Sequence, residues 1–231
     1  GGFNARALCG RRAVMSGRII ILEGTDASGK STQLDLLTQH LRADGRDFRT
    51  VAFPRYSEDS SALIRMYLAG DFGKTPGDVN AYAASTFFAV DRYASYKSDW
   101  KDYYDAGGIL LFDRYTTSNA VHQGAKLARD ERERFWSWLF DFEYNLMGLP
   151  APSAVLFLDM PPEFAARLLI ARAEATDIHE NDAEYRARCY EAACQVAKLY
   201  SWSRIECVNS ADIRSKEDIA RDIYKEILKK L

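Results

Sequence analysis

A glycine-rich segment near the start of the chain has the residues and the spacing of a phosphate-binding loop. Residues 24–31 read G-T-D-A-S-G-K-S and match the pattern G-x-x-x-x-G-K-[ST]. In such a loop, successive backbone N–H groups and the start of the next helix form a cradle for anions. We expect the Lys30 ammonium to reach the β- and γ-phosphates of a nucleotide and the Ser31 hydroxyl to bind Mg²⁺. The predicted phosphate contacts are Gly24, Thr25, Asp26, Ala27, Ser28, Gly29, Lys30, Ser31 and Thr32.

The surroundings of this segment favour the phosphate-binding interpretation over a simple glycine-rich turn with an exposed lysine. An apolar run, residues 19–22, precedes it and is typical of a buried strand. Leu34, Leu37 and Leu41 then recur at helical spacing, and Gly45 is suited to ending that helix. A strand before the loop and a helix after it are what phosphate binding requires.

The rest of the chain predicts the sheet that would position this loop. Apolar runs suited to buried parallel strands occupy residues 18–22, 48–53, 109–113, 154–159 and 204–208, and helical stretches separate them. This alternation indicates an α/β fold with three layers, in which helices cover both faces of a five-stranded parallel sheet. Because no linker-like segment interrupts the chain, we expect one domain over residues 16–231, preceded by a disordered extension or cloning remnant over residues 1–15.

Composition restricts the kinds of partner. The chain has 31 Lys and Arg against 33 Asp and Glu, a formal net charge of -2, so no global charge suggests nucleic acid or an anionic membrane. The four cysteines lack C-x-x-C spacing and are typical of reduced thiols in a cytoplasmic protein. No span approaches the ~18 apolar residues of a membrane helix.

Chemically informative residues follow the predicted strands, and the carboxyl ends of parallel strands are where ligands bind. Asp113 comes at the end of the third strand and is predicted to lie on the Mg²⁺ side of the site, although an Asp there also starts turns. Arg114 offers a guanidinium fork matched to phosphate. Arg55, just after the second strand, could bind an acceptor phosphate or lie in solvent.

A long helix is predicted over residues 78–104. Its apolar stripe is expected to run through Val79, Tyr82, Ala83, Thr86, Phe87 and Val90. Phe88 and Arg92 lie one turn apart on another side, where an aromatic face and a cation suit a planar polar ring. The alternative is a Phe that covers the next helix, with Arg92 extending to solvent.

Later segments add three expectations. A helix with a buried face through Phe135, Trp138, Leu139, Phe142 and Leu146 should precede the fourth strand. After that strand, residues 170–183 are predicted to form a lid with arginine near its start, or else a charged surface helix. Ser215 and Asp218 have the spacing of a capping box at the start of the last helix.

From residue 18 onward the chain resembles the thymidylate kinases. The resemblance is carried by residues 113–124, D-R-Y-T-T-S-N-A-V-H-Q-G, by Phe53-Pro54 and by Phe88-x-x-x-Arg92, in the same order as in the family. It implies a P-loop fold and transfer of the γ-phosphoryl group of ATP to dTMP, giving ADP and dTDP, in a Mg²⁺-dependent cytoplasmic homodimer.

The same resemblance implies a role for individual residues. Phe88 would stack on thymine, Arg92 would bond its carbonyl edge, and Arg114 would bridge the donor and acceptor phosphates. The implied dTMP contacts are Asp26, Phe53, Arg55, Phe88, Arg92, Arg114, Ser118, Asn119, His122 and Gln123. Catalytic roles fall to Lys30, Arg114, Arg172 and Asp26, and metal contacts to Ser31 and Asp113.

Three positions depart from the family pattern. Ala27 stands where some members have an arginine. The positive charge that stabilises the γ-phosphate is therefore expected to come from an arginine of the lid, and Arg172 aligns with that lid arginine. Arg55 lies one place earlier than in F-P-x-R, with Tyr56 in the usual place. His122 stands where the family has Tyr or Phe, so it either lines the pocket or packs locally.

Other functions fit the sequence less well. A deoxynucleoside kinase shares the phosphate loop and would accept thymidine in place of dTMP. A GTPase-like switch is disfavoured because the chain has no N-K-x-D run and no D-x-x-G after the third strand. A non-catalytic nucleotide-binding module is disfavoured because Lys30, Ser31 and Asp113 are all present.

Overall fold

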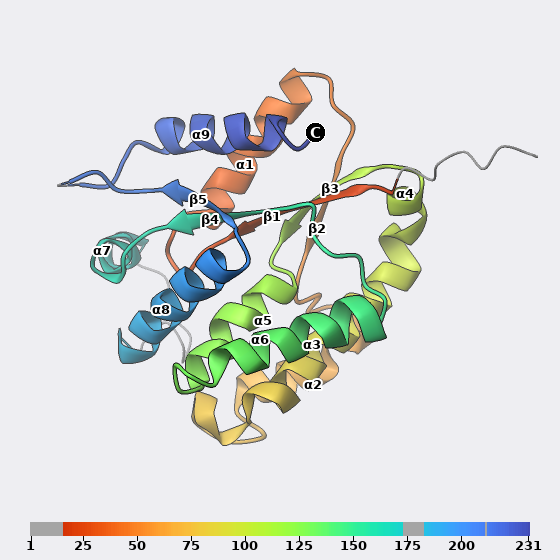
Figure 1. Cartoon of the computed structure of the whole chain (residues 1–231), viewed down its shortest axis with the longest axis vertical. Coiled ribbons are helices and arrows are strands. Elements are labelled where there is room, and N and C mark those ends of the chain that lie inside the picture. The colour runs from red at the N-terminus through yellow and green to blue at the C-terminus, as the bar shows by residue number, and fades with distance from the viewer. Residues whose placement is uncertain (1–15, 173–182, 211) are drawn as a thin grey trace, which may run out of the picture.

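A five-stranded parallel sheet forms the centre of the molecule (Figure 1). The computed structural model describes residues 16–172, 183–210 and 212–231. The strand order is β2-β3-β1-β4-β5, which places β1 and the loop after it in the middle of the sheet. All five predicted strands are confirmed, with shifts of one or two residues at the ends of β1, β2 and β5. Their bounds are β1 Arg18–Glu23, β2 Arg49–Ala52, β3 Ile109–Asp113, β4 Ala154–Asp159 and β5 Ser203–Glu206.

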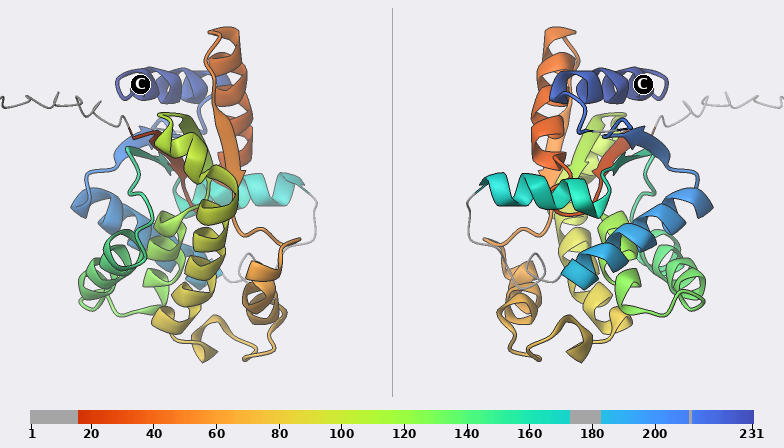
Figure 2. Two further views of the ribbon diagram at one scale, coloured as in Figure 1. Left: turned by 90° about the vertical axis from the view of Figure 1, so that its right-hand side faces the viewer. Right: turned by 90° about the vertical axis from the view of Figure 1, so that its left-hand side faces the viewer.

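Helices cover both faces of the sheet, so the predicted three-layer architecture is confirmed. Figure 1 and the rotated views in Figure 2 show α1 and α9 on one face, with α3, α5, α6 and α8 on the other. The helices are α1 Lys30–Ala43, α2 Ala62–Ala69, α3 Ala81–Ser95, α4 Lys101–Asp105, α5 Thr116–His122, α6 Arg132–Phe140, α7 Pro162–Arg172, α8 Ala183–Leu199 and α9 Lys216–Leu228. One-turn 3₁₀ segments occupy Asp59–Ser61, Pro76–Asp78 and Gly124–Lys126, and π-helical turns occupy Tyr96–Trp100 and Asp141–Leu146.

The apolar run of β1 is explained by burial on both faces. Ile20 and Leu22 belong to the core under α1 and α9, where Leu37 also lies. Ile19 and Ile21 belong to the core on the opposite face. A strand that is buried on both sides has no solvent-facing positions, which is why its sequence reads as a continuous apolar run.

The prediction for the 78–104 helix was only partly right. Helix α3 begins after Asn80, whose Oδ1 accepts from the backbone N–H of Ala83 at 2.9 Å, and a π-helical turn separates it from α4. The predicted apolar stripe was wrong, because Tyr82 and Val90 are 36% and 49% exposed. The buried face instead carries small residues and Arg92, which approach α5 and the helix after α6 closely.

The other helix predictions can also be compared with the structure. Leu146 was wrongly assigned to the core and is 75% exposed, because the π-helical turn after α6 shifts the helical register. Helix α1 ends just before Gly45, as predicted, and the Ser215 hydroxyl accepts from the backbone N–H of Asp218 at the start of α9. The extension at residues 1–15 and most of the expected lid, residues 173–182, lie outside the described residues.

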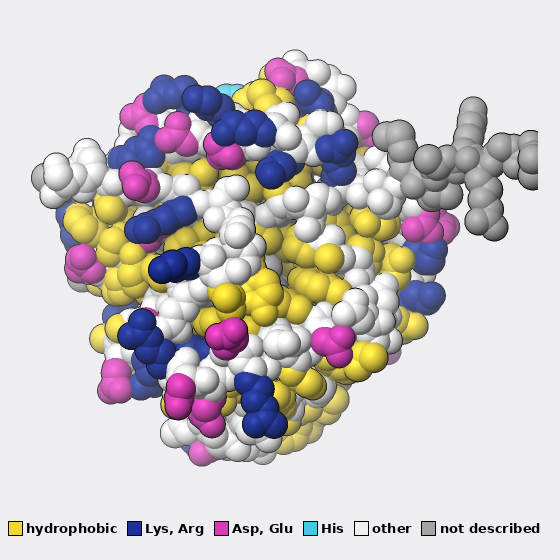
Figure 3. All heavy atoms as spheres, in the orientation of Figure 1, with side chains coloured by type: hydrophobic (Ala, Val, Ile, Leu, Met, Phe, Trp, Pro, Cys, Tyr) yellow, Lys and Arg dark blue, Asp and Glu magenta, His cyan; other side chains and the backbone are white. Residues whose placement is uncertain are grey.

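The surface is not organised around one sign of charge on the face shown in Figure 3. Basic and acidic side chains are interspersed there over α1 and α9. Among the described residues, no helix combines the length and the apolar character needed to cross a bilayer. Cys189, Cys194 and Cys207 are free thiols.

Candidate active site

The phosphate loop connects β1 to α1 at the carboxyl edge of the sheet. Gly29 caps α1 in a left-handed conformation with φ 87°, which favours glycine. At Gly24, a Cβ would lie only 2.6 Å from the Ser28 Oγ, so a side chain there would collide with that hydroxyl. The Ser28 hydroxyl is buried and has no hydrogen-bond partner among the residues that the structure describes. A tight loop with an unsatisfied inward hydroxyl suits a ligand rich in oxygen acceptors.

Lys30 lies inside this loop. Its Nζ donates to the carbonyl oxygens of Gly24 and Thr25 at 2.5 and 3.0 Å. Burial, with the positive charge of nearby Arg114 acting in the same direction, lowers the pKa of the Lys30 ammonium to about 8. Neighbouring carboxylates raise this pKa but only partly offset the two lowering effects. Phosphate oxygens would supply the negative charge that favours the protonated form.

Glu23 joins the phosphate loop to the segment after β3. Its side chain is fully buried and accepts from the backbone N–H of Gly24 at 2.9 Å. It also accepts from the hydroxyls of Thr117 and Ser118, each at 2.8 Å. One carboxylate therefore positions both the first residue of the loop and the first turn of α5.

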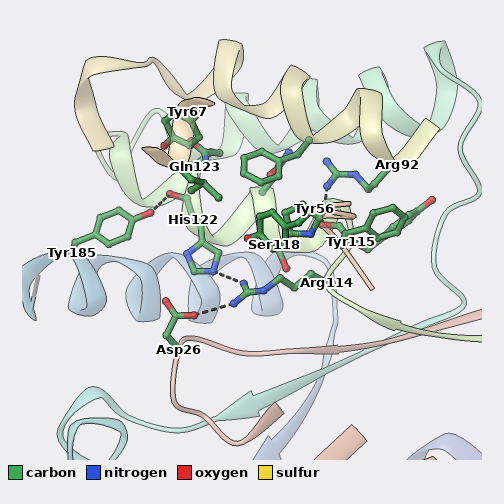
Figure 4. Close-up of a pocket in the computed structure, with 15 residues that line it drawn as sticks. Asp26, Tyr56, Tyr67, Arg92, Arg114, Tyr115, Ser118, His122, Gln123 and Tyr185 are labelled. Carbon is green, nitrogen blue, oxygen red and sulfur yellow. Dashed lines mark hydrogen bonds and ion pairs between the residues drawn. The ribbon is translucent and has the colours of Figure 1, made fainter. Parts of the chain in front are cut away.

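Arg114 lies between the phosphate loop and a cavity beside it. It follows β3 directly, with φ 66°, and its Nη2 donates to the Asp26 Oδ1 at 3.1 Å. Its Nη1 lies 3.2 Å from the His122 Nε2 (Figure 4). Burial alone would raise the pKa of Asp26, but the neighbouring His122, Arg114 and Lys30 side chains more than offset this and hold it well below its usual range. Asp26 is therefore an anion that orients Arg114.

The cavity brings together most of the predicted acceptor residues. Nine of the ten predicted dTMP contacts line it, from the phosphate loop, the end of β2, α3 and α5: Asp26, Phe53, Phe88, Arg92, Arg114, Ser118, Asn119, His122 and Gln123. Pro54, Tyr56, Tyr67, Leu68, Tyr115 and Tyr185 complete the lining (Figure 4). The cavity thus has aromatic walls and a few polar groups, which is typical of a small-molecule site.

Phe88 and Arg92 occupy one wall of the cavity. The Tyr67 ring packs edge-on against Phe88, with centroids 6.3 Å apart. Arg92 donates to Glu143 through Nε and Nη2 at 2.7 and 2.6 Å, and both side chains are almost completely buried. The Thr116 hydroxyl donates to the same carboxylate at 2.7 Å. This bidentate pair fixes the plane of the guanidinium.

Two amide side chains, one on α5 and one directly after it, line the cavity. The Asn119 Nδ2 donates to the backbone carbonyl of Ser85 on α3 at 3.2 Å. The Gln123 Oε1 is buried and has no hydrogen-bond partner within the described part of the chain. A buried acceptor without a partner is costly, so this atom marks a place where a ligand N–H would be favourable.

The tenth predicted acceptor residue, Arg55, is held outside the cavity lining. Its Nε lies 3.3 Å from the Asp91 Oδ1 and its Nη2 lies 3.1 Å from the Ser60 hydroxyl. Its Nη1 also pairs with Asp99. Asp91 is buried and in addition accepts from the Arg55 backbone N–H at 2.9 Å, so this arginine fastens the end of β2 to α3.

The oxygen groups near the loop are suited to Mg²⁺. In the register of the sheet, Asp113 lies beside Leu22, two residues before the loop begins, and Ser31 is exposed on the first turn of α1. A hydroxyl and a carboxylate are hard oxygen ligands, and Mg²⁺ completes its octahedron with water and phosphate oxygens. The described residues contain no group of three or more His, Cys, Asp or Glu that could hold a metal by itself.

Lys126 provides a pH-dependent test of the cavity wall. Its Nζ donates to the Tyr67 hydroxyl at 2.8 Å and to the Val79 carbonyl, and burial lowers its pKa to about 8. Between that value and the unfolded value of about 10.4, the unfolded chain holds one more proton, so stability rises with pH. We expect the free energy of unfolding of wild type relative to Lys126→Met, from urea titrations, to increase across this interval. A difference that stays constant or falls would contradict the buried-lysine assignment; Lys198→Met on the exposed side of α8 is the control.

The sequence did not identify every residue that builds the site. Glu23 carried a signal, because it is a carboxylate that continues an apolar strand. Glu143 carried none, since it lies on a different helix from its partner Arg92 and far from it along the chain. Tyr67 and Tyr185 reach the cavity from α2 and α8, and only the packing of those helices shows this.

Fold and site together define the class of the protein. A glycine-rich loop between β1 and α1, and a cavity beside it at the carboxyl edge of a parallel sheet, are the features of a P-loop nucleotide kinase. The sequence model of the family described as "Thymidylate kinase" matches residues 22–220, and the chain belongs to that family. It is therefore an enzyme of the dTMP kinase type.

Individual relatives agree over nearly the whole chain. The thymidylate kinase of Mycobacterium tuberculosis is 31% identical over 201 residues, which cover 84% of this chain and 92% of the relative. The human thymidylate kinase is 29% identical over 203 residues, with 87% of each chain covered. That of Plasmodium falciparum is 25% identical, with 92% of this chain and 90% of the relative covered.

Proposed function

We propose that the cavity binds dTMP and that the phosphate loop binds ATP, so that the γ-phosphoryl group passes between them to give dTDP and ADP. The observation that carries this assignment is the position of Arg114. Its guanidinium lines the cavity and at the same time pairs with Asp26 of the loop. A fork in that position can bind the acceptor phosphate beside the transferring group.

Positioning and electrostatics do most of the chemical work. Lys30 and Arg114 neutralise the charge of the transferring group, and Arg172, at the end of α7, is proposed to add lid charge there, in the absence of an arginine at Ala27. The acceptor is already a phosphate anion, so no strong general base is needed. The aromatic walls would exclude water from the reacting groups.

The base is proposed to be selected by shape and by directed hydrogen bonds. Phe88 stacks on the pyrimidine, and Arg92 meets its carbonyl edge in an orientation fixed by Glu143. The Gln123 Oε1 accepts from a ring N–H, which satisfies its missing hydrogen bond. A site with such groups rejects a base of the wrong pattern, because its polar atoms would be left unpaired.

Mg²⁺ is proposed to bind at Ser31 and Asp113 together with phosphate oxygens. The ion would neutralise charge on the donor phosphates and orient them. Ser31 lies on the first turn of α1 and Asp113 ends β3, so both groups are held by elements of the sheet layer.

The quaternary and cellular context is also a proposal. Residues 16–231 would act as one catalytic unit, and two copies would associate through exposed apolar side chains on the neighbouring helices α2 and α3. These are Leu63, Met66, Val90 and Tyr93, which are 39–49% exposed. Free thiols fit the reducing environment of the cytoplasm.

ADP formation with a panel of acceptors tests the function. We expect dTMP to be preferred over dUMP, dCMP, dGMP and AMP, and thymidine to be a poor acceptor because it lacks the phosphate that Arg114 binds. Equal turnover of all monophosphates would refute the base assignment. A preference for thymidine would indicate a deoxynucleoside kinase, and no turnover with any acceptor would indicate a binding module.

A further inference from the structure

His122 connects the cavity to helix α8. Its Nε2 lies 3.2 Å from the Arg114 Nη1, and its Nδ1 lies 3.7 Å from the Cys189 Sγ. The backbone carbonyl of His122 accepts from the Tyr185 hydroxyl at 3.0 Å. Figure 4 shows the Arg114 guanidinium joined by dashed lines to both the imidazole and the Asp26 carboxylate, with Tyr185 on the other side of His122. Both ring nitrogens therefore have a neighbour of known chemistry.

These neighbours select one protonation state of the imidazole. A guanidinium has only donors, so the Nε2 must accept from Arg114 and cannot carry a proton. The proton then lies on Nδ1, facing a sulfur that is a weak acceptor. Burial raises the pKa of the Cys189 thiol to about 12, so that sulfur carries no charge at neutral pH. The geometry fits the neutral Nδ1–H tautomer.

We propose that His122 is a positioning residue, whose neutral Nδ1–H tautomer holds Arg114 in the orientation that receives the acceptor phosphate, and that its protonation releases this arginine. The inference rests on the proposed function of Arg114. Asp26 holds Nη2 and His122 holds Nη1, so two atoms fix the plane of the fork. With only one of them, the guanidinium could turn about the remaining contact.

The charged groups around His122 set the sign of the pH effect. Arg114 is the nearest, and Lys30 of the loop adds a second positive charge close to it. Among the described residues, Asp26 is an opposing anion, while Cys189 and Tyr185 of α8 have raised pKa values through burial and stay neutral. Protonation converts Nε2 from acceptor to donor and places a cation against a cation. We therefore expect weaker dTMP binding as pH falls.

Two variants separate positioning from packing. His122→Leu keeps an apolar side chain against Cys189 but removes the acceptor, and we expect the KM for dTMP to rise on the order of tenfold, as for the loss of a hydrogen bond to a charged group, with little change in the KM for ATP. His122→Gln offers an Oε1 near the position of Nε2 and should restore much of the loss. Equal KM values for dTMP in wild type and both variants would overturn the proposal.

The pH profile supplies a readout that a packing role would not change. Histidine is the side chain that changes its charge between pH 5 and 8. We expect the KM for dTMP to rise more steeply toward pH 5 in wild type than in His122→Gln. The phosphate of dTMP titrates equally in both assays, so the variant controls for that effect. Superimposable profiles, or tighter binding by wild type at acid pH, would contradict the proposal. Thermal melting of all three proteins shows whether each is folded.

Nitrogen-15 NMR of the imidazoles tests the tautomer without any turnover. The chain has only 3 histidines, so the signals that disappear in His122→Gln assign His122. A protonated Nδ1 and an unprotonated Nε2 at neutral pH are expected, and the opposite tautomer would overturn the inference. If wild type shows the expected tautomer but does not phosphorylate dTMP, the proposed function fails. If wild type phosphorylates dTMP and both variants do so with the same kinetics, only this inference fails.

Discussion

Arg114→Met is expected to lower kcat/KM for dTMP by at least ~10²-fold, the usual effect of removing a donor that stabilises charge in the transition state. Arg114 is the one side chain that we find contacting both the phosphate loop and His122 on the cavity wall within the described residues. Methionine keeps most of the stem volume, so the change removes the charged fork and little packing. Steady-state ADP formation at varied dTMP concentration measures the effect.

A second substitution at Arg114 separates the role of the guanidinium geometry from that of the positive charge. Arg114→Lys keeps a positive charge but has a single nitrogen, which cannot hold Asp26 and meet His122 together, so we expect only a small part of the activity to return. Arg221→Met on the exposed side of α9 is the matched control, with activity like that of wild type. If Arg114→Met retains more than a tenth of wild-type kcat/KM, the assignment of Arg114 to the reacting phosphates is wrong.

Glu143→Gln is expected to lower the free energy of unfolding by roughly 3–5 kcal/mol, the usual cost of leaving a buried charge without its partner. Arg92 and Glu143 are 2% and 0% exposed, so water cannot replace the lost carboxylate. Glutamine has nearly the same volume and can still bond Thr116, which limits the loss to the charge. Urea unfolding monitored by tryptophan fluorescence measures the effect.

The double variant Arg92→Met/Glu143→Leu separates stability from recognition. Replacing a buried ion pair by apolar side chains is often neutral or stabilising, so most of the lost stability should return. The affinity for dTMP should not return, because the cation at the base edge is gone. A double variant that is stable and binds dTMP like wild type would show that Arg92 only supports the fold.

The parts of the fold that sequence could predict are those determined by local pattern. A strand buried on both faces must be apolar throughout, so β1, β3 and β4 were readable as runs of Ile, Leu, Val and Phe. The phosphate loop and residues 113–114 were readable because chain topology alone brings strand ends together. Most of the residues predicted to bind dTMP line one cavity for the same reason.

The errors arose where distant partners decide burial. Helix α3 turns Asp91 and Arg92 inward, against the usual rule for charged residues, because Arg55 and Glu143 satisfy them. A window of neighbouring residues contains neither partner, so the pattern pointed to Tyr82 and Val90 as the buried stripe. The same long-range pairing explains why Arg55 is fastened to α3.

Because of Glu23, part of the entropy cost of aligning the two substrates is met when the protein folds. Its carboxylate bonds the first residue of the phosphate loop and two hydroxyls at the start of α5, all without exposure to water. The halves of the site that are proposed to hold donor and acceptor are thereby set at a fixed spacing as the chain folds. Much of the translational freedom that two substrates would lose on meeting has thus been removed before either of them binds. One buried carboxylate thus fixes the distance between the two proposed substrate sites.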